Sequence, residues 1–374
     1  MTRQRVYLDY NATAPLRPAA RAAFVAALDC VGNPSSVHGD GRVARSLVED
    51  ARRDVARFVN AKSSEVVFTS GATESNASAL GQGWDTIFVP GTEHVSVLAS
   101  AAASGARVVT VPVGSSGRVS GESLAQAIAA AGPVGRALLT VQMANNETGV
   151  LQDVARLAEI ARGAGLTVHS DAVQASGRIE INFAALGIDL MSLSAHKMGG
   201  PKGVGALVIR DGVNVKPLLA GGGQERRRRG GTENIAAIAG FGAAARDARD
   251  LVSVTSVKSL RDGLERHILA LTPQAVVIGA DAERLANTAC VALAGTQSET
   301  LVIKLDLAGV SVSAGSACSS GKVGASHVLA AMQVPEALAA GAVRISLGPD
   351  TTDDDIAAFL TAWSGIAARI GKAA

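Results

Sequence analysis

The sequence predicts an α/β protein in which a large domain, built on a mostly parallel seven-stranded sheet between helices, precedes a smaller α+β domain. Between Glu65 and Arg210, short apolar runs alternate with helical stretches, as is typical of βαβ units. After about Val257 the order changes to helix, strand, strand, helix, strand, helix. Of the 374 residues, 48% are hydrophobic and 18% charged, which suffices for the cores of two domains.

Seven apolar runs are predicted to form the strands of the large sheet. They are Glu65–Thr69, Thr86–Val89, Arg107–Pro112, Arg136–Val141, Leu166–Ser170, Asp189–Ser194 and Val204–Ile209. Helical patterns lie between several of them, at Val95–Ala103, Gly121–Ala131 and Asp153–Ala164. Because ligands of such sheets bind beyond the carboxyl ends of the strands, candidate site residues are sought there.

Domain boundaries follow from the later helices. A long alanine-rich helix is expected from just after Thr232 to about Leu251, where the large domain ends. We therefore divide the chain into residues 1–15, a segment packing with the small domain, 16–251, the large domain, and 252–374, the small domain. Thr352 and Asp355 have the spacing of a capping box, which predicts the start of the last helix.

Composition excludes several classes of protein. The net charge is only +2 and aromatic residues are 3%, which argues against nucleic-acid binding. No apolar run reaches the length of a membrane span, and no signal peptide is recognised at the start. The three cysteines are widely spaced without a CxxC pair, so we expect no disulfide framework and a cytoplasmic location. The histidines lack metal-binding spacing, so no metal site is expected.

The segment Ser70–Asn76 follows the first predicted strand and opens a helix. Free N–H groups at a helix start bind phosphate, although an ordinary capped turn would have the same sequence. Nucleotide fingerprints are missing, since no GxGxxG follows a strand. The stretch Gly315–Val323 departs from a Walker loop in its glycine spacing and in Val323, so an NTPase or NAD enzyme is disfavoured.

Polar residues also follow two other strands. Asp171 and Gln174 come after one, and His196 and Lys197 after the next. A desolvated lysine can form a Schiff base, and an aspartate can keep a pyridine nitrogen protonated. Each alone would be a surface lysine or a helix cap, but with the phosphate cradle they predict a pyridoxal 5'-phosphate (PLP) site.

Several motifs resemble one enzyme family. Ser194-Ala195-His196-Lys197 with Gly200-Pro201-Lys202-Gly203 resembles the PLP-lysine motif of class V aminotransferase-type enzymes. The stretches 316–321 and 326–329 resemble the cysteine loop of cysteine desulfurases of the NifS/IscS-like group, and residues 7–15, 33–38, 145–149 and 221–226 also fit. The resemblance runs from Val6 to about Ile356. It implies a PLP fold-type I homodimer that converts L-cysteine to L-alanine and passes sulfur, as a persulfide, to acceptor or scaffold proteins for iron–sulfur cluster assembly or thiolation.

The resemblance also implies roles for individual residues. Lys197 would bind PLP covalently and shuttle protons, Asp171 would pair the ring nitrogen, Gln174 the ring hydroxyl, and His94 would stack on the ring and assist proton transfer. Phosphate would be held by Ala72, Thr73, Ser194 and His196, with Thr232 reaching the site of the partner subunit. Asn146 and Arg344 would bind the substrate carboxylate, Asn146 also lying against the cofactor and Asn11 near that pocket. Cys318 would be the nucleophile that receives sulfur.

Some of these residues admit a structural interpretation. Arg344 lies in an apolar run, where either a substrate carboxylate or a structural salt bridge would satisfy its charge. Cys30 and Cys290 are interpreted as packing residues, whereas the polar neighbours of Cys318 predict an accessible thiol. The run Arg226–Arg229 has an arginine at 227 where the family usually has glycine, and we assign the run to a subunit interface or to the cofactor entrance.

Two other functions remain open at this point. A related PLP enzyme, such as a selenocysteine lyase or an aminotransferase, would share the lysine and aspartate, although an aminotransferase needs no thiol at Cys318. A non-catalytic sulfur carrier or scaffold would not need Lys197, Asp171, His94 and Cys318 together.

Overall fold

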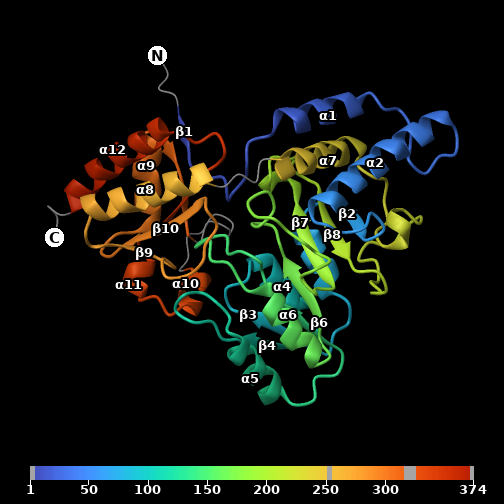
Figure 1. Cartoon of the computed structure of the whole chain (residues 1–374), viewed down its shortest axis with the longest axis horizontal. Helices are drawn as coiled ribbons and strands as arrows, with labels where there is room; N and C mark the ends of the chain where they lie inside the picture. The colour runs from blue at the N-terminus through green and yellow to red at the C-terminus, as the bar shows by residue number, and fades with distance from the viewer. Residues whose placement is uncertain (1–4, 251–254, 316–325, 371–374) are drawn as a thin grey trace.

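The computed structural model describes residues 5–250, 255–315 and 326–370. Figure 1 shows two bodies side by side, one built around β7 and β8 and the other around β10. Within the described residues, no helix is both long enough and apolar enough to cross a membrane.

The larger body contains the predicted seven-stranded sheet, which confirms the fold class. Its strands are β2 (Val66–Thr69), β3 (Thr86–Pro90), β4 (Arg107–Val111), β5 (Ala137–Thr140), β6 (Thr167–Asp171), β7 (Leu190–Ser194) and β8 (Gly205–Ile209), in the order β2-β8-β7-β6-β5-β3-β4. Only β8 runs antiparallel to its neighbours. The short connection 195–204 explains this, because a parallel crossover needs a dozen or more residues.

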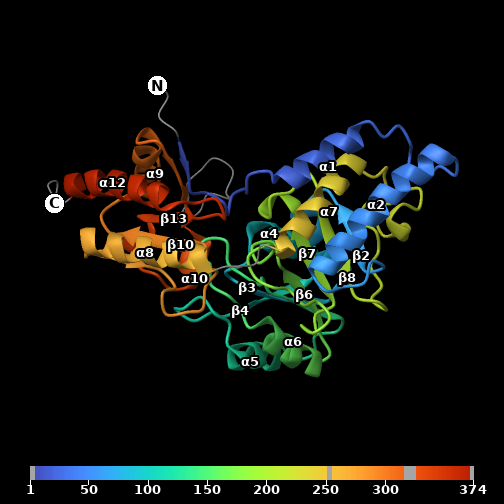
Figure 2. The same cartoon turned by 45° about the horizontal axis from the view of Figure 1, so that its top comes forward.

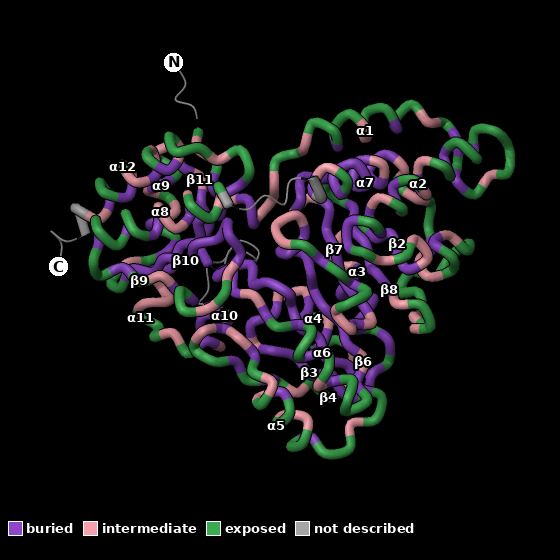
Figure 3. The backbone as a smooth tube through the Cα atoms, viewed as in Figure 1, coloured by how far each residue is buried: buried purple, intermediate pink, exposed green. Residues whose placement is uncertain are grey.

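Helices cover this sheet. They are α1 (Pro18–Leu28), α2 (Gly39–Phe58), α3 (Ala72–Leu80), α4 (Val95–Ala103), α5 (Gly121–Ala131), α6 (Val154–Gly163) and α7 (Ile235–Asp250), with short 3-10 turns at Ala195–Lys197 and Glu225–Arg227. In Figures 1 and 2, α1, α2 and α7 lie together near β2, whereas α5 and α6 lie near β4. Most strands are buried along their length (Figure 3), as expected for a sheet covered on both faces.

The smaller body has its own sheet and core. Its elements are α8 (Thr255–Leu271), β9 (Ala275–Val277), β10 (Thr288–Leu293), α9 (Ser298–Leu307), β11 (Val310–Ser311), β12 (Ser313–Ala314), α10 (His327–Ala331), α11 (Glu336–Ala339), β13 (Ala342–Ser346) and α12 (Asp353–Ile370). The predicted order corresponds to α8, β9, β10, α9, β13 and α12. The four short elements were missed because they contain too few residues for a periodic pattern. The capping box is confirmed: Thr352 N–H donates to Asp355 Oδ2 at 2.9 Å, and Asp355 N–H to Thr352 Oγ1 at 3.3 Å.

Residues 6–14, here called the N-terminal strap, join the two bodies. Strand β1 (Val6–Tyr7) pairs in parallel with β11, and Leu8 is buried in the core of the smaller body. Further along, Ala14 N–H donates to His196 O at 2.9 Å in the larger body. These contacts support the proposed division into 1–15, 16–251 and 252–374, which stays a prediction.

Candidate active site

A cavity of about 510 Å³ opens where β2, β3, β5, β6 and β7 end. Nine residues predicted for the site line it: Ala72, Thr73, His94, Asn146, Asp171, Gln174, Ser194, His196 and Lys197. Asn11 and Arg344 are buried beside the cavity rather than in its lining, and Thr232 is exposed. Cys318 lies outside the described residues.

The start of α3 fits a phosphate group. Gly71 occupies the N-cap position without a side chain to bond the first N–H groups of the helix, so Ala72 and Thr73 present them to the cavity. Glu74 also lines the cavity, but Arg229 Nε donates to it at 2.9 Å and Ser70 N–H at 2.8 Å. Because these donors compensate its charge, Glu74 opposes an anion only weakly.

Asp171 and Lys197 are suited to the two reactive groups of a pyridine aldehyde such as PLP, the ring nitrogen and the aldehyde, respectively. Asp171 is 6% exposed at the end of β6, where its carboxylate accepts from Asn76 Nδ2 at 2.9 Å and Val173 N–H at 3.0 Å. Lys197 Nζ donates to the carbonyl oxygens of Asn11 at 2.7 Å and Ala12 at 3.0 Å. The strap therefore holds the amine in the cavity that the carboxylate also lines.

His94 is held in one tautomer by its position at the N-cap of α4. Its Nδ1 accepts from Ser96 N–H at 3.1 Å, so the proton of the neutral ring is on Nε2. Burial, then the charges of Lys197 and His327, lower the pKa of His94, although Asp171 acts in the opposite direction. His94 is therefore neutral near pH 7 and presents an N–H donor.

His196 contacts the strap through Thr13, whose Oγ1 lies 3.2 Å from Nδ1. Burial, then the charges of Lys197, Lys202 and Arg178, lower the pKa of His196 to about 4. Like His94, it is neutral near pH 7, and it can serve a phosphate only as a neutral donor.

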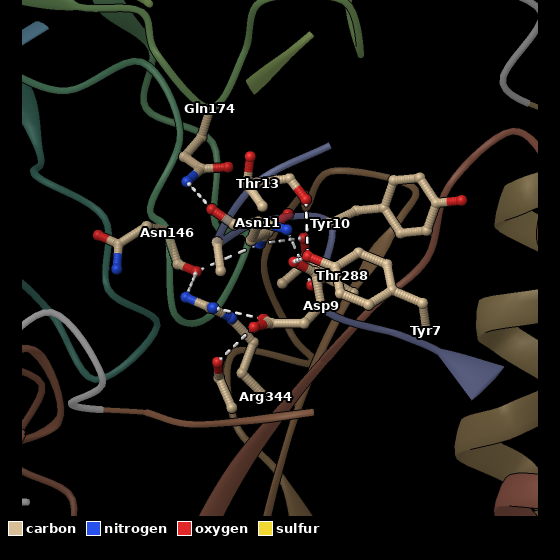
Figure 4. A network of polar contacts seen from close by, with 12 residues as sticks. Tyr7, Asp9, Tyr10, Asn11, Thr13, Asn146, Gln174, Thr288 and Arg344 are labelled. Atoms are coloured by element: carbon tan, nitrogen blue, oxygen red, sulfur yellow. Dashed lines mark hydrogen bonds and ion pairs between the residues drawn. The ribbon is translucent and has the colours of Figure 1, made fainter. Parts of the chain in front are cut away.

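Asn11 contacts the cavity through its backbone. Its carbonyl accepts from Gln174 Nε2 at 3.0 Å, and its side-chain Nδ2 donates to Asn146 O at 3.2 Å and to Thr288 Oγ1 at 3.0 Å (Figure 4). The side chain thus points away from the cavity and ties the strap to β10, so Asn11 contacts the site through main-chain atoms.

Arg344 forms a structural ion pair, whereas its role toward the substrate carboxylate stays a prediction. It is 1% exposed on β13, and its Nη2 pairs with Asp9 Oδ1 at 2.8 Å, which is a structural ion pair (Figure 4). Its Nη1 donates to Asn146 O at 3.1 Å, while its Nε has no partner among the described residues. One buried donor next to Asn146 is therefore available for a ligand.

Two buried carboxyl groups were missed in the sequence. Burial raises the pKa of Glu147 to about 7, against opposing contributions from Ser326, which donates to Oε2 at 2.6 Å, and from Arg344. Burial also raises the pKa of Glu93 well above its usual value, and His327 Nε2 lies 2.8 Å from the Glu93 carbonyl. Both glutamates are next in sequence to a residue predicted for the site. They were missed because a sequence motif does not show which side chains are buried.

The other cysteines differ from each other. Cys290 is fully buried on β10, and burial raises its pKa to about 12, which confirms the interpretation as packing. Cys30 is only partly buried after α1, so its interpretation as a packing residue stays a prediction. In the arginine run, Arg229 contacts the cavity through Glu74, as expected for the cofactor entrance.

Comparison with known proteins gives one consistent result. The model of the family "Aminotransferase class-V" matches residues 6–359. A cysteine desulfurase of Cereibacter sphaeroides is 44% identical over 94% of this chain and 93% of its own. An IscS-like cysteine desulfurase of Mycobacterium tuberculosis is 40% identical over 98% of both chains. The X-ray structure of a NifS-like protein from Rickettsia africae superposes with a TM-score of 0.90 at 35% identity, covering 97% of this chain and 99% of its own.

Proposed function

Since this chain belongs to the class-V aminotransferase family, we propose that it is a PLP-dependent cysteine desulfurase that removes sulfur from L-cysteine through Cys318. The observation that carries the proposal is the common cavity of Lys197, Asp171 and His94 beside the uncapped start of α3. A carboxylate, an amine and a phosphate cradle in one cavity meet the needs of PLP.

The described residues that follow Cys318 in the sequence support its proposed role as the nucleophile. After residue 325 the described structure resumes at Ser326, which bonds to Glu147, and His327, which bonds to the Glu93 carbonyl. Glu147 follows Asn146 in the sequence, and Glu93 precedes His94. Because Asn146 and His94 line the cavity, Cys318 is only a few residues along the chain from its rim.

Several residues of the chain have separate roles in the steps that precede sulfur transfer. When bound, PLP supplies an electron sink for the α-carbon of the attached amino acid. Asp171 keeps the proton on the ring nitrogen, and Lys197 takes the proton from the α-carbon. Neutral His94 holds an N–H donor over the reacting atoms, and Arg344 with Asn146 orients the substrate carboxylate.

The sulfur step uses Cys318 as nucleophile. Its thiolate attacks the sulfur of the bound cysteine, so that an S–S bond forms while the bond between sulfur and Cβ breaks. The electron pair of that bond stays with carbon, which takes up protons and leaves as alanine. Cys318 retains the sulfur as a persulfide, which a thiol of an acceptor protein then removes.

We further propose that the active protein is a homodimer. Thr232 is exposed and outside the cavity of its own chain, as a residue serving the phosphate of a partner subunit would be. The acceptor of sulfur is proposed to be a thiol-bearing protein, such as an iron–sulfur scaffold.

The test is a paired assay on the PLP-loaded protein with L-cysteine and a reductant. Alanine and sulfide should form in equal amounts, and Cys318→Ala should lose both, whereas Cys290→Ala, at the buried cysteine, should retain both. Alanine formation that is indifferent to Cys318 would overturn the nucleophile and leave a PLP enzyme of another kind.

A further inference from the structure

The orientation of the Gln174 amide follows from its partners. A glutamine presents an oxygen and an NH₂ group of nearly equal size, so only the surrounding donors and acceptors decide which way it faces. Gln174 Oε1 lies 2.6 Å from Arg178 Nη1. Its Nε2 lies 3.0 Å from the Asn11 carbonyl (Figure 4). Because a guanidinium has donors only, the oxygen must face Arg178. The NH₂ group is then turned toward the strap.

Arg178 is partly buried and, among the described residues, donates hydrogen bonds to neutral oxygens. Besides Gln174 Oε1, its guanidinium donates to the carbonyl oxygens of Gln174 at 2.6 Å and Tyr10 at 3.2 Å. Burial, followed by the positive charge of Arg344, lowers the pKa of Arg178 to about 9, and no carboxylate opposes this shift. Among the described residues, Arg178 has no carboxylate partner, so an ion pair does not explain its place in the fold.

The carbonyl of Asn11 makes the orientation of Gln174 relevant to the site. This oxygen accepts from Gln174 Nε2 and also from Lys197 Nζ. A Gln174 amide turned the other way would present its oxygen to the Asn11 carbonyl, and two acceptors would face each other. It would also present an acceptor rather than a donor to any ring hydroxyl in the cavity that Gln174 lines.

We propose that Arg178 is a positioning residue that fixes the Gln174 amide so that its NH₂ group, not its oxygen, is available to the ring hydroxyl of PLP. Arg178 touches neither substrate nor cofactor and acts through Gln174. The inference rests on the proposed function only in requiring that PLP binds, and it does not depend on desulfuration or on Cys318.

The experiment is a pH titration of the visible absorbance of PLP bound to the full-length protein. A donor fixed toward the ring oxygen favours its ionised form, so Arg178→Met should raise the apparent pKa of the bound chromophore by about one unit. Arg178→Lys retains a cationic donor and should shift it less. Arg210→Met is the matched control, because Arg210 also donates to backbone carbonyls, those of Ile188 and Phe183, but makes no bond to Gln174.

A double-mutant cycle with Gln174→Ala separates positioning from a general loss of charge. If Arg178 acts through Gln174, the Arg178→Met shift should fall to less than half in the Gln174→Ala background. Should Arg178→Met not fold, Arg178→Lys completes the same cycle. An unchanged titration in the Arg178 variant, or an equal shift in both backgrounds, would overturn the inference. Failure of the alanine and sulfide assay would instead overturn the proposed function.

Discussion

Two buried arginines, Arg52 and Arg344, differ in how completely their guanidinium groups are hydrogen-bonded within the chain. Arg52, on α2, donates through Nη1 and Nη2 to Glu225 at 2.6 and 2.8 Å, through Nη1 to Val66 O at 2.9 Å and through Nε to Glu49 at 3.1 Å. Arg344, beside the cavity, makes one ion pair, with Asp9, and leaves Nε without a described partner. Arg52 is thus hydrogen-bonded through all three guanidinium nitrogens, whereas Arg344 keeps one N–H without a partner among the described residues.

The same contrast extends to other buried polar atoms. Among the described residues, the atoms without a hydrogen-bond partner are Asn76 Oδ1, Thr92 Oγ1, Glu93 Oε2, Ser170 Oγ, Glu233 Oε2 and Arg344 Nε. Asn76 bonds to Asp171, and Arg344 is itself a predicted site residue. Three of the others, Glu93, Ser170 and Glu233, are next in sequence to one. Since buried polar groups are normally satisfied, their concentration here indicates a site that exchanges bonds with a ligand.

The largest effect on stability is expected at the buried pair of Arg52 and Glu225. Glu225→Gln removes one charge of a fully buried pair and leaves Arg52 with only the partly exposed Glu49 as a counter-ion, which should lower the free energy of unfolding by about 3–5 kcal/mol. Urea denaturation of the full-length protein measures it. Asp211→Asn, in the exposed pair with Lys62, is the control and should change little. Equal effects of the two variants would show that burial does not distinguish the pairs.

Beside the cavity, the stability contributed by Glu147 should depend on pH. Because its folded pKa, about 7, lies above the usual 4.5, the folded state holds the proton more tightly. The stability contribution is complete below pH 4.5 and is lost as the pH rises through 7, amounting to about 3 kcal/mol. Relative to wild type, Glu147→Gln should therefore gain that amount between pH 5 and pH 8 in urea denaturation, and the exposed Glu299→Gln should not. A difference that stays constant with pH would contradict the raised pKa.

Arg344→Lys tests whether Arg344 contributes to substrate binding as well as to the ion pair with Asp9. Lysine keeps the charge but lacks the Nε donor that has no partner among the described residues, so we expect a KM for L-cysteine about 10–100-fold higher with an unchanged absorbance of bound PLP. The control is Arg261→Lys, since Arg261 is also buried in the smaller body but donates to the Leu285 and Thr288 carbonyls. Lower stability with an unchanged KM would mean that Arg344 serves only the ion pair with Asp9.

Local patterns predicted the sheet and the residues at its strand ends, such as Asp171 and Lys197, because apolar runs and the carboxyl-end rule both operate within short segments. Contacts that join distant segments were not predictable. The pairing of Asp9 with Arg344 and of Tyr10 with Arg178 depends on how the strap crosses between the two bodies. The burial of Glu147 likewise follows from tertiary packing.

The smallest effect concerns the backbone beside the satisfied pair. Arg227 has φ +67°, in the left-handed region, where a side chain is unfavourable. Relief of that strain in Arg227→Gly exceeds the added freedom of the unfolded chain, so we expect a gain of about 0.5 kcal/mol in urea denaturation. The neighbouring Arg228, at φ −95° and donating to Ser64 O at 3.0 Å, makes Arg228→Gly the matched control, which should destabilise. If both glycine variants lost stability equally, the positive φ of Arg227 would carry no measurable strain.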